Sequence, residues 1–486
     1  MGRPLRQLAS DTAVYGLSSM LARFINYVLV PFYTHVFTTA EYGAVAKIYA
    51  AFVLLNVVYT YGMESAYLKF AANKSQDAMR RTFSTALVSL AATALSFSLI
   101  LVLFRGSAAD LMRLAPDQQT LILYMAGVLI ADTLLAVPMA HLRLARRSWL
   151  FAAIRLTSVG VNLGLNLWLI LGLGWGVEAV LLSNLVASLV AACAALFSAR
   201  HLFAAAFDRT LLGGMLRFGL PFVPTGAAYA ITEAVDRFFL DRMPVDRVEA
   251  LYGEGMAADD VVGIYNACFK LGVFMLLYVQ MFRFAWQPFF LQHQDAPEAP
   301  RLFSRAFTIF TAVGLWVFLA VSLFARHIVA IPVPVGGQTQ PLINPAYWDG
   351  LFIVPLILLA YLAQGWYTHF TAGVFIRGRT IHLPWITLLG AGVTLLINGL
   401  FTAQYGMTAA SAAALASHAV MAAAIGVVAQ RMYAVPYEWG RLAAMGCVAA
   451  AAYGLHAVTA DGAIAARLAI VVVAGAALAV TAYRRT

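Results

Sequence analysis

Seven basic side chains lie inside long apolar segments of the sequence, and their chemistry limits what the protein can bind. They are Arg23, Lys47, Lys69, Arg155, Arg237, Lys270 and Arg283. A charge inside a bilayer is costly, so it normally faces a polar cavity, an opposite charge or the nearest interface. Guanidinium and ammonium groups bind carboxylates and phosphates. A cavity lined by several of them favours an anion, and phosphate is the obvious candidate.

The depth of each cation helps to separate ligand binding from snorkelling. Arg23 lies roughly 20 Å from either end of the first apolar segment, too far to reach an interface comfortably. Lys47 and Lys69 share the second segment, and on a continuous helix they fall on one stripe. Lys69 lies near a segment end, where snorkelling explains it as well as function does. Lys270 and Arg283 are further cavity candidates, and aromatic neighbours could also hold Arg283.

The predicted substrate-binding set is therefore cationic and spread over several segments. It comprises Arg23, Lys47, Lys69, Arg237, Lys270 and Arg283.

Acidic residues well inside the segments are fewer than the cations. They are Glu64, Asp132, Glu233 and Asp236. Structural pairing is the default interpretation for all of them, and coupling to H⁺ or Na⁺ is the alternative. Glu233, Arg237 and Asp241 follow one another at four-residue spacing, which predicts an internally paired ladder. Arg155 and Asp132 are predicted to pair with each other.

Membrane-spanning helices must position these residues. Of 486 residues, 62% are hydrophobic and 11% are charged, whereas soluble domains are roughly a quarter charged. A water-soluble fold is thereby excluded, and the segments are too long for the strands of a membrane barrel. A span needs about 20 apolar residues, which predicts an all-α polytopic membrane protein with about fourteen transmembrane helices. Their expected limits are 10–36, 42–71, 82–104, 118–141, 148–171, 177–199, 213–240, 262–290, 303–325, 350–376, 381–402, 407–429, 439–458 and 463–482.

The remaining cations predict the orientation, because Lys and Arg concentrate in cytoplasmic loops. With the N-terminus inside, nineteen Lys and Arg residues fall on the cytoplasmic side and six on the opposite side. We therefore expect both termini to be cytoplasmic, which agrees with an even number of spans.

Two short similarities indicate an internal repeat. Glu41–Val45 corresponds to Val261–Tyr265, and Trp175–Ala179 corresponds to Tyr405–Ala409. Transporters are commonly built from repeated halves with the substrate site between them. The repeat predicts a first six-helix lobe over 1–200, a second over 201–432, and two additional helices over 433–486.

Sequence motifs for catalysis and cofactor binding are missing. The chain has no P-loop and no His or Cys spacing typical of a metal site. We therefore predict no catalytic residue, no metal and no cofactor other than a coupling ion. A membrane-embedded glycosyltransferase or polymerase would need catalytic acids or a large outer loop, and the longest outer loops are about twenty residues.

Short motifs distributed over the first eight segments resemble a known family. Tyr15–Arg23, followed by Val30–Thr34 and Glu41–Gly43, resembles the N-terminal signature of polysaccharide-biosynthesis membrane proteins. These are the Wzx-type O-antigen and lipid-linked oligosaccharide flippases of the multidrug/oligosaccharidyl-lipid/polysaccharide (MOP) exporter superfamily. Further matches are Arg217–Pro221, Asp236–Leu240 and Val262–Tyr265 followed by Lys270.

This resemblance implies two lobes around a central cavity in the bacterial inner membrane. It implies a flippase that carries a polyprenyl-pyrophosphate-linked oligosaccharide, an O-antigen or exopolysaccharide unit, from the cytoplasmic to the outer leaflet. Arg23 resembles a cationic position on the first helix of such flippases. Expected partners are this glycan lipid, membrane lipids, and polysaccharide polymerase and chain-length proteins, but not nucleic acid.

Two alternatives within the same fold remain open. One is a multidrug/cation antiporter, against which the interior cations argue. The other is a lipid II flippase, which concentrates arginines in its first two helices, whereas the second segment here carries lysines.

Overall fold

The computed structural model describes residues 29–72, 74–204, 207–335, 338–379, 381–458 and 464–483. Within these ranges, eleven helices are long and apolar enough to cross a membrane. They correspond to the second to sixth, eighth to twelfth and fourteenth predicted segments. The all-α polytopic membrane fold is thus confirmed. A total of fourteen spans and the cytoplasmic position of both termini stay predictions.

The described chain forms two compact units. The first extends to Arg242 and includes Ala257–Gly263, and the second comprises Met243–Met256 and the chain from Ile264 onward. Helix α13 (Ala258–Phe269) therefore begins in the first unit and continues into the second. The predicted division at residues 200 and 432 stays a prediction.

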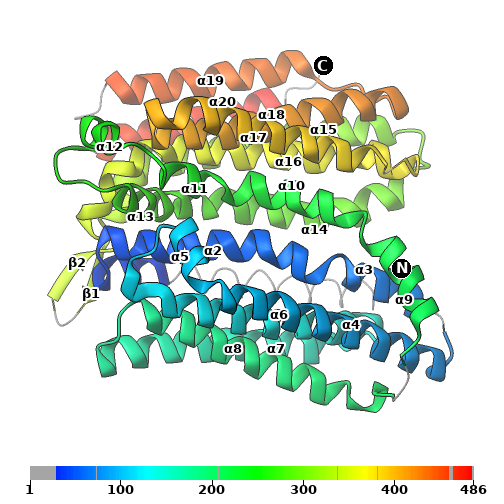
Figure 1. Cartoon of the computed structure of the whole chain (residues 1–486). Coiled ribbons are helices and arrows are strands. Elements are labelled where there is room, and N and C mark those ends of the chain that lie inside the picture. The colour runs from blue at the N-terminus through cyan, green and yellow to red at the C-terminus, as the bar shows by residue number, and fades with distance from the viewer. Residues whose placement is uncertain are drawn as a thin grey trace. The chain divides into compact units, whose positions relative to one another are not determined.

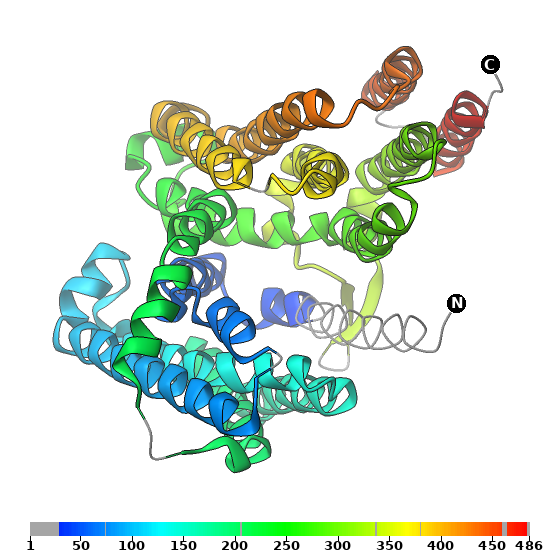
Figure 2. The ribbon, with the colours of Figure 1, turned by 90° about the vertical axis from the view of Figure 1, so that its right-hand side faces the viewer.

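The first unit is a set of long helices that run side by side, drawn from blue to green in Figure 1 and seen more nearly end-on in Figure 2. Its elements are α2 (Thr39–Thr60), α3 (Met63–Ala71), α4 (Gln76–Leu103), α5 (Arg105–Leu111), η1 (Pro116–Gln119), α6 (Thr120–Leu144), α7 (Ser148–Leu167), η2 (Trp168–Gly172), α8 (Val177–Ser198), η3 (Arg200–Leu202), α9 (Arg209–Gly219), α10 (Phe222–Ala234) and α11 (Asp236–Leu240).

Side-chain caps determine where several of these helices begin. The Thr38 hydroxyl accepts a hydrogen bond from the Glu41 backbone N–H, and the Glu41 carboxylate accepts one from the Thr38 backbone N–H. Asp208 accepts a hydrogen bond from the Leu211 N–H at the start of α9. Such caps satisfy backbone donors that the first turn of a helix leaves unpaired.

The second predicted segment, 42–71, is interrupted in its second half. Tyr61 and Gly62 adopt positive φ angles of 32° and 71°, so α2 ends at Thr60 and α3 begins at Met63. The single stripe expected for Lys47 and Lys69 assumed a continuous helix and is therefore wrong: Lys47 is buried and Lys69 is exposed.

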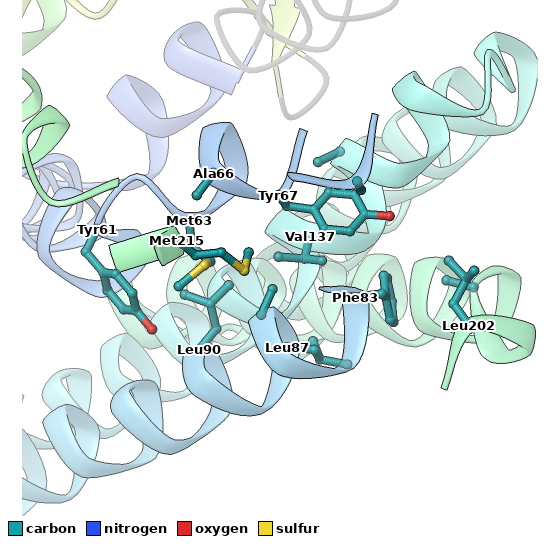
Figure 3. Close-up of a cluster of buried hydrophobic side chains, with 14 residues drawn as sticks. Tyr61, Met63, Ala66, Tyr67, Phe83, Leu87, Leu90, Val137, Leu202 and Met215 are labelled. Carbon is teal, nitrogen blue, oxygen red and sulfur yellow. The ribbon is translucent and has the colours of Figure 1, made fainter. Parts of the chain in front are cut away.

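A buried apolar cluster holds α3 in place after this break (Figure 3). Tyr67 of α3 packs edge-on against Phe83 of α4, and Val137 of α6 and Met215 of α9 complete the contact. Burying such side chains contributes about 1.5–3 kcal/mol each. Packing thus fixes a helix of nine residues that would be unstable by itself.

The seventh predicted segment is also divided, into α9, α10 and α11. A Cβ atom on Gly62 would overlap the backbone carbonyl oxygen of Gly219, the last residue of α9. Gly219 belongs to the Arg217–Pro221 motif noted in the sequence. That motif therefore marks a close backbone contact between the breaks in two segments.

The second unit also consists of long helices, with one short hairpin. Its elements are α12 (Val245–Tyr252), the rest of α13, η4 (Lys270–Gly272), α14 (Val273–His293), α15 (Ala299–Val329), β1 (Pro332–Val335), β2 (Gln338–Pro341), η5 (Pro345–Ile353), α16 (Val354–Ile376), α17 (His382–Tyr405), α18 (Met407–Met432), α19 (Trp439–Val458) and α20 (Ile464–Tyr483). The strands pair antiparallel, with Pro332 opposite Pro341.

Packed aromatic rings join three helices of this unit. The Trp286 ring of α14 lies 4.3 Å from the His369 ring of α16, and Phe307 of α15 lies 4.8 Å from it. The Trp286 indole N–H donates to the His369 backbone carbonyl oxygen at 3.2 Å. The neighbouring helices are therefore held in a specific register as well as by apolar contact.

We predict that Gly62→Ala destabilises the protein by roughly 2 kcal/mol, because a Cβ there meets the Gly219 backbone at a positive φ. The matched control is Gly160→Ala on α7, where a Cβ meets nothing within 4 Å. Thermal unfolding in detergent checks both. Equal melting temperatures for the two variants would contradict this account of the break.

Candidate functional site

Two helix starts meet at a pair of glycines in the first unit. A Cβ on Gly43 of α2 would overlap the carbonyl oxygen of Asp259, and a Cβ on Gly263 of α13 would overlap that of Thr39. The Thr39 hydroxyl also donates a hydrogen bond to the Asp260 carboxylate. The two glycine contacts are equivalent: each glycine approaches the carbonyl oxygen four residues before the other glycine. The internal repeat that relates Gly43 to Gly263 also relates Thr39 to Asp259. Only glycine allows this backbone approach.

Lys47 lies one helical turn after Gly43, and its side chain has no exposed surface. Its Nζ is 2.8 Å from Asp241 Oδ1 and 2.5 Å from Asp259 Oδ1, and it donates to the Arg113 backbone carbonyl oxygen at 3.0 Å. These four residues are the Lys47 cluster. The ammonium group donates hydrogen bonds to Asp241 and to the Arg113 carbonyl oxygen, and it forms an ion pair with Asp259 as well.

Burial makes each charge of the Lys47 cluster depend on the others. Asp241 follows the last residue of α11 and is only 2% exposed. Burial raises the pKa of its carboxyl, while the Lys47 ammonium acts in the opposite direction. The Arg113 guanidinium donates to the Asp241 backbone carbonyl oxygen at 2.8 Å. The positive charge of Lys47 is therefore taken up by the protein itself in this structure.

The predicted ladder on the seventh segment does not extend to Asp241. Arg237 donates to the Asp236 carboxylate at 2.7 Å and to the Glu233 backbone carbonyl oxygen at 2.7 Å. Asp241, the third member of the expected ladder, contacts Lys47 instead. The segment ends in short helices, so the four-residue spacing does not continue along one helix face. Arg237 and Asp236 are both buried, and they form an ion pair.

Lys69 and Glu64 both lie on α3 but have separate partners. The Glu64 carboxylate pairs with Arg143, near the end of α6. The exposed Lys69 ammonium lies 3.9 Å from the centre of the Phe218 ring and 5.9 Å from that of Phe70. Lys69 therefore combines a cation–π contact with access to solvent.

The other predicted residues occupy separate helices. Lys270 is half-buried in η4, and Arg283 is exposed on α14. Asp132 on α6 forms a hydrogen bond with Ser188 of α8, and its expected pairing with Arg155 stays a prediction. Arg23 lies outside the described residues.

The sequence-based prediction missed several partners because they are distant in sequence. Asp241 and Asp259 lie 194 and 212 positions after Lys47 in the numbering, and Arg143 lies 79 positions after Glu64. The internal repeat could have indicated Asp259, because it relates the start of α13 to the start of α2, where Lys47 lies. Within the described ranges, no group of three His, Cys, Asp or Glu side chains could hold a metal ion.

The fold resembles that of known membrane transporters and flippases. A lipid II flippase, MurJ, in an inward closed conformation aligns with a TM-score of 0.76 at 12% identity, covering 97% of this chain and 98% of that one. An inward-facing MATE family multidrug resistance transporter of the MOP superfamily gives 0.63 at 13%, covering 87% and 97%. A MATE transporter from Vibrio cholerae gives 0.56 at 12%, covering 88% and 95%. No curated protein matches the chain in sequence.

The protein is thus an all-α polytopic membrane protein whose fold is like that of MurJ and the MATE transporters. The sequence pattern of the family described as "Polysaccharide biosynthesis protein" matches residues 8–294, which include every member of the Lys47 cluster. The chain belongs to this polysaccharide biosynthesis family.

We predict that Lys47→Met destabilises the protein by roughly 3–5 kcal/mol, because it leaves the buried Asp241 carboxylate without its partner. Denaturant unfolding of the purified protein measures the change. The double variant Lys47→Met/Asp241→Asn should recover part of the loss. Lys74→Met, at an exposed lysine, should be neutral. A neutral Lys47→Met would show that the cluster has no structural role.

Proposed function

We propose that the protein is a flippase that carries a polyprenyl-pyrophosphate-linked oligosaccharide from the cytoplasmic to the outer leaflet of a bacterial inner membrane. The observation that carries this proposal is the family match, which associates the chain with polysaccharide biosynthesis. A fold that aligns with a lipid II flippase over 97% of the chain supports it. Such a substrate combines a pyrophosphate and a glycan, which need a polar path, with a lipid tail that stays in the bilayer.

The cations of the spans divide into two groups under this proposal. Lys47 and Arg237 are paired with carboxylates and stabilise the first unit. Lys69 and Arg283 have exposed side chains, and together with Arg23 and Lys270 they form the proposed pyrophosphate-binding set. Charge-assisted hydrogen bonds from such groups to phosphate oxygens are the strong contacts that this chemistry requires.

The sign of these charges favours an anionic lipid over an organic cation. A cation antiporter needs carboxylates or aromatic faces that hold a positive ligand. Here the acids Glu64 and Asp236 are paired with arginines. An O-antigen or exopolysaccharide unit is the proposed glycan, with polymerase and chain-length proteins as downstream partners.

The proposed activity is transport without a chemical step on the substrate. Substrate binding must differ between the inward-facing and outward-facing states if an H⁺ or Na⁺ gradient is to drive the cycle. Among the acids predicted for coupling, Asp132 contacts a serine, and Glu64 and Asp236 pair with arginines. The arginine partners favour a structural role for Glu64 and Asp236.

We predict that Arg23→Gln and Arg283→Gln each slow transfer of a pyrophosphate-linked oligosaccharide between leaflets at least about tenfold, through the loss of a charge-assisted contact. The rate is measured in proteoliposomes that contain labelled substrate. An enzyme or quencher added outside acts only on the substrate in the outer leaflet. Arg379→Gln, at an exposed arginine beyond the end of α16, is the matched control.

The outcome is informative only if the variants fold, so melting temperature and monodispersity are compared first. Folded Arg23→Gln and Arg283→Gln proteins that transfer substrate at the rate of Arg379→Gln would overturn the proposed cationic site.

A further inference from the structure

A groove of about 480 Å³ lies along α18 in the second unit. Small residues of α18 line it, namely Ala422, Ala423 and Gly426, together with Phe370 of α16. A Cβ added at Gly426 would be 3.3 Å from the Phe370 ring, so a glycine keeps this space open. The volume is within the range of about 300–1,000 Å³ typical of small-molecule sites. We name it the α18 groove.

The aromatic side of the α18 groove belongs to the segment that joins α18 to α19. Tyr437 and Trp439 line the groove, with ring centres 5.5 Å apart. Trp439 is 61% exposed at the first residue of α19. In the groove it lies with residues from the end of α18, and tryptophan at the end of a transmembrane helix is typical of the membrane–water interface.

Hydrogen bonds fix this connecting segment, so the groove is preformed. The Gln430 side chain donates to the Val435 backbone carbonyl oxygen at 2.8 Å and accepts from its N–H at 3.1 Å. The Ser304 hydroxyl of α15 donates to the Pro436 backbone carbonyl oxygen at 2.7 Å. Two helices therefore hold the segment that carries Tyr437.

One cation at the groove lacks a carboxylate among the described residues. Arg431 lines the groove in the last turn of α18 and is exposed. The neighbouring Arg441 is neutralised by Glu438 at 2.6 Å, and Glu438 also accepts a hydrogen bond from Thr308. Arg431 forms no ion pair within the part of the chain that the structure describes.

We propose that the α18 groove binds an anionic phospholipid of the cytoplasmic leaflet, with one acyl chain along α18 and the phosphate at Arg431. The apolar lining suits a hydrocarbon chain, while Arg431 and Trp439 lie where the headgroup of such a chain would be. The orientation predicted from the Lys and Arg distribution puts Arg431 on the cytoplasmic side, where basic pockets between transmembrane helices are suited to anionic headgroups. The site lies entirely in the second unit and does not depend on the proposed transport activity.

The test measures lipid binding to the purified full chain in neutral detergent by native mass spectrometry and thermal shift. The probes are phosphatidylglycerol and phosphatidylcholine with identical acyl chains, and inorganic phosphate. We expect phosphatidylglycerol to bind at least tenfold more tightly than phosphatidylcholine and to raise the melting temperature. Inorganic phosphate should have no such effect.

Two variants separate the two halves of the site. Arg431→Gln should reduce phosphatidylglycerol binding to the level of phosphatidylcholine, and Arg379→Gln, another exposed arginine of this unit, should not. Ala423→Leu, at an exposed residue of the groove, should weaken both lipids, unlike Ala403→Leu at an exposed residue of α17.

Three results would each overturn the proposal. They are equal binding of the two phospholipids, unchanged phosphatidylglycerol binding by Arg431→Gln, and stabilisation by inorganic phosphate alone. Because Arg431 and Ala423 are exposed, their substitution should leave the fold intact, and the melting temperature of each lipid-free variant checks this.

Discussion

The buried charge of Lys47 is the constraint on which the first unit depends. An ammonium group with no exposed surface needs compensating partners, and the structure supplies them from three distant parts of the chain: Arg113, Asp241 and Asp259. Asp259 can reach it because the glycine pair at the starts of α2 and α13 allows the backbones of these two helices to touch. The glycine contact and the ion pair between Lys47 and Asp259 both lie at the starts of α2 and α13, so a change in one of them should disturb the other.

This arrangement also determines where the chain passes from one unit to the next. The first turns of α13 contact α2, whereas the residues from Ile264 onward belong to the second unit. The family motif that includes Gly263 is thus explained by a structural need, as is the motif that includes Gly219, which touches Gly62. Both motifs mark close backbone contacts.

Composition and periodicity were sufficient to predict the all-α membrane fold, because apolar segments of about 20 residues have few other stable arrangements. They could not predict the interruption at Tyr61–Gly62, where contact with Gly219 and a buried cluster override helix continuity. Charge pairing was predicted from neighbours along one helix, which failed for Asp241. The true partner of Asp241 is 194 positions away, and only the tertiary fold brings the two together.

The central claim is that the substrate is an anionic glycan lipid that is moved and not chemically changed. The most direct measurement compares, in the same wild-type proteoliposomes, transfer between leaflets of a polyprenyl-pyrophosphate-linked oligosaccharide and of an uncharged lipid with the same glycan and tail. The account predicts transfer of the pyrophosphate-linked lipid alone, recovered chemically unaltered. Equal transfer of the two lipids, or no transfer of either while an organic cation is transported, would contradict it.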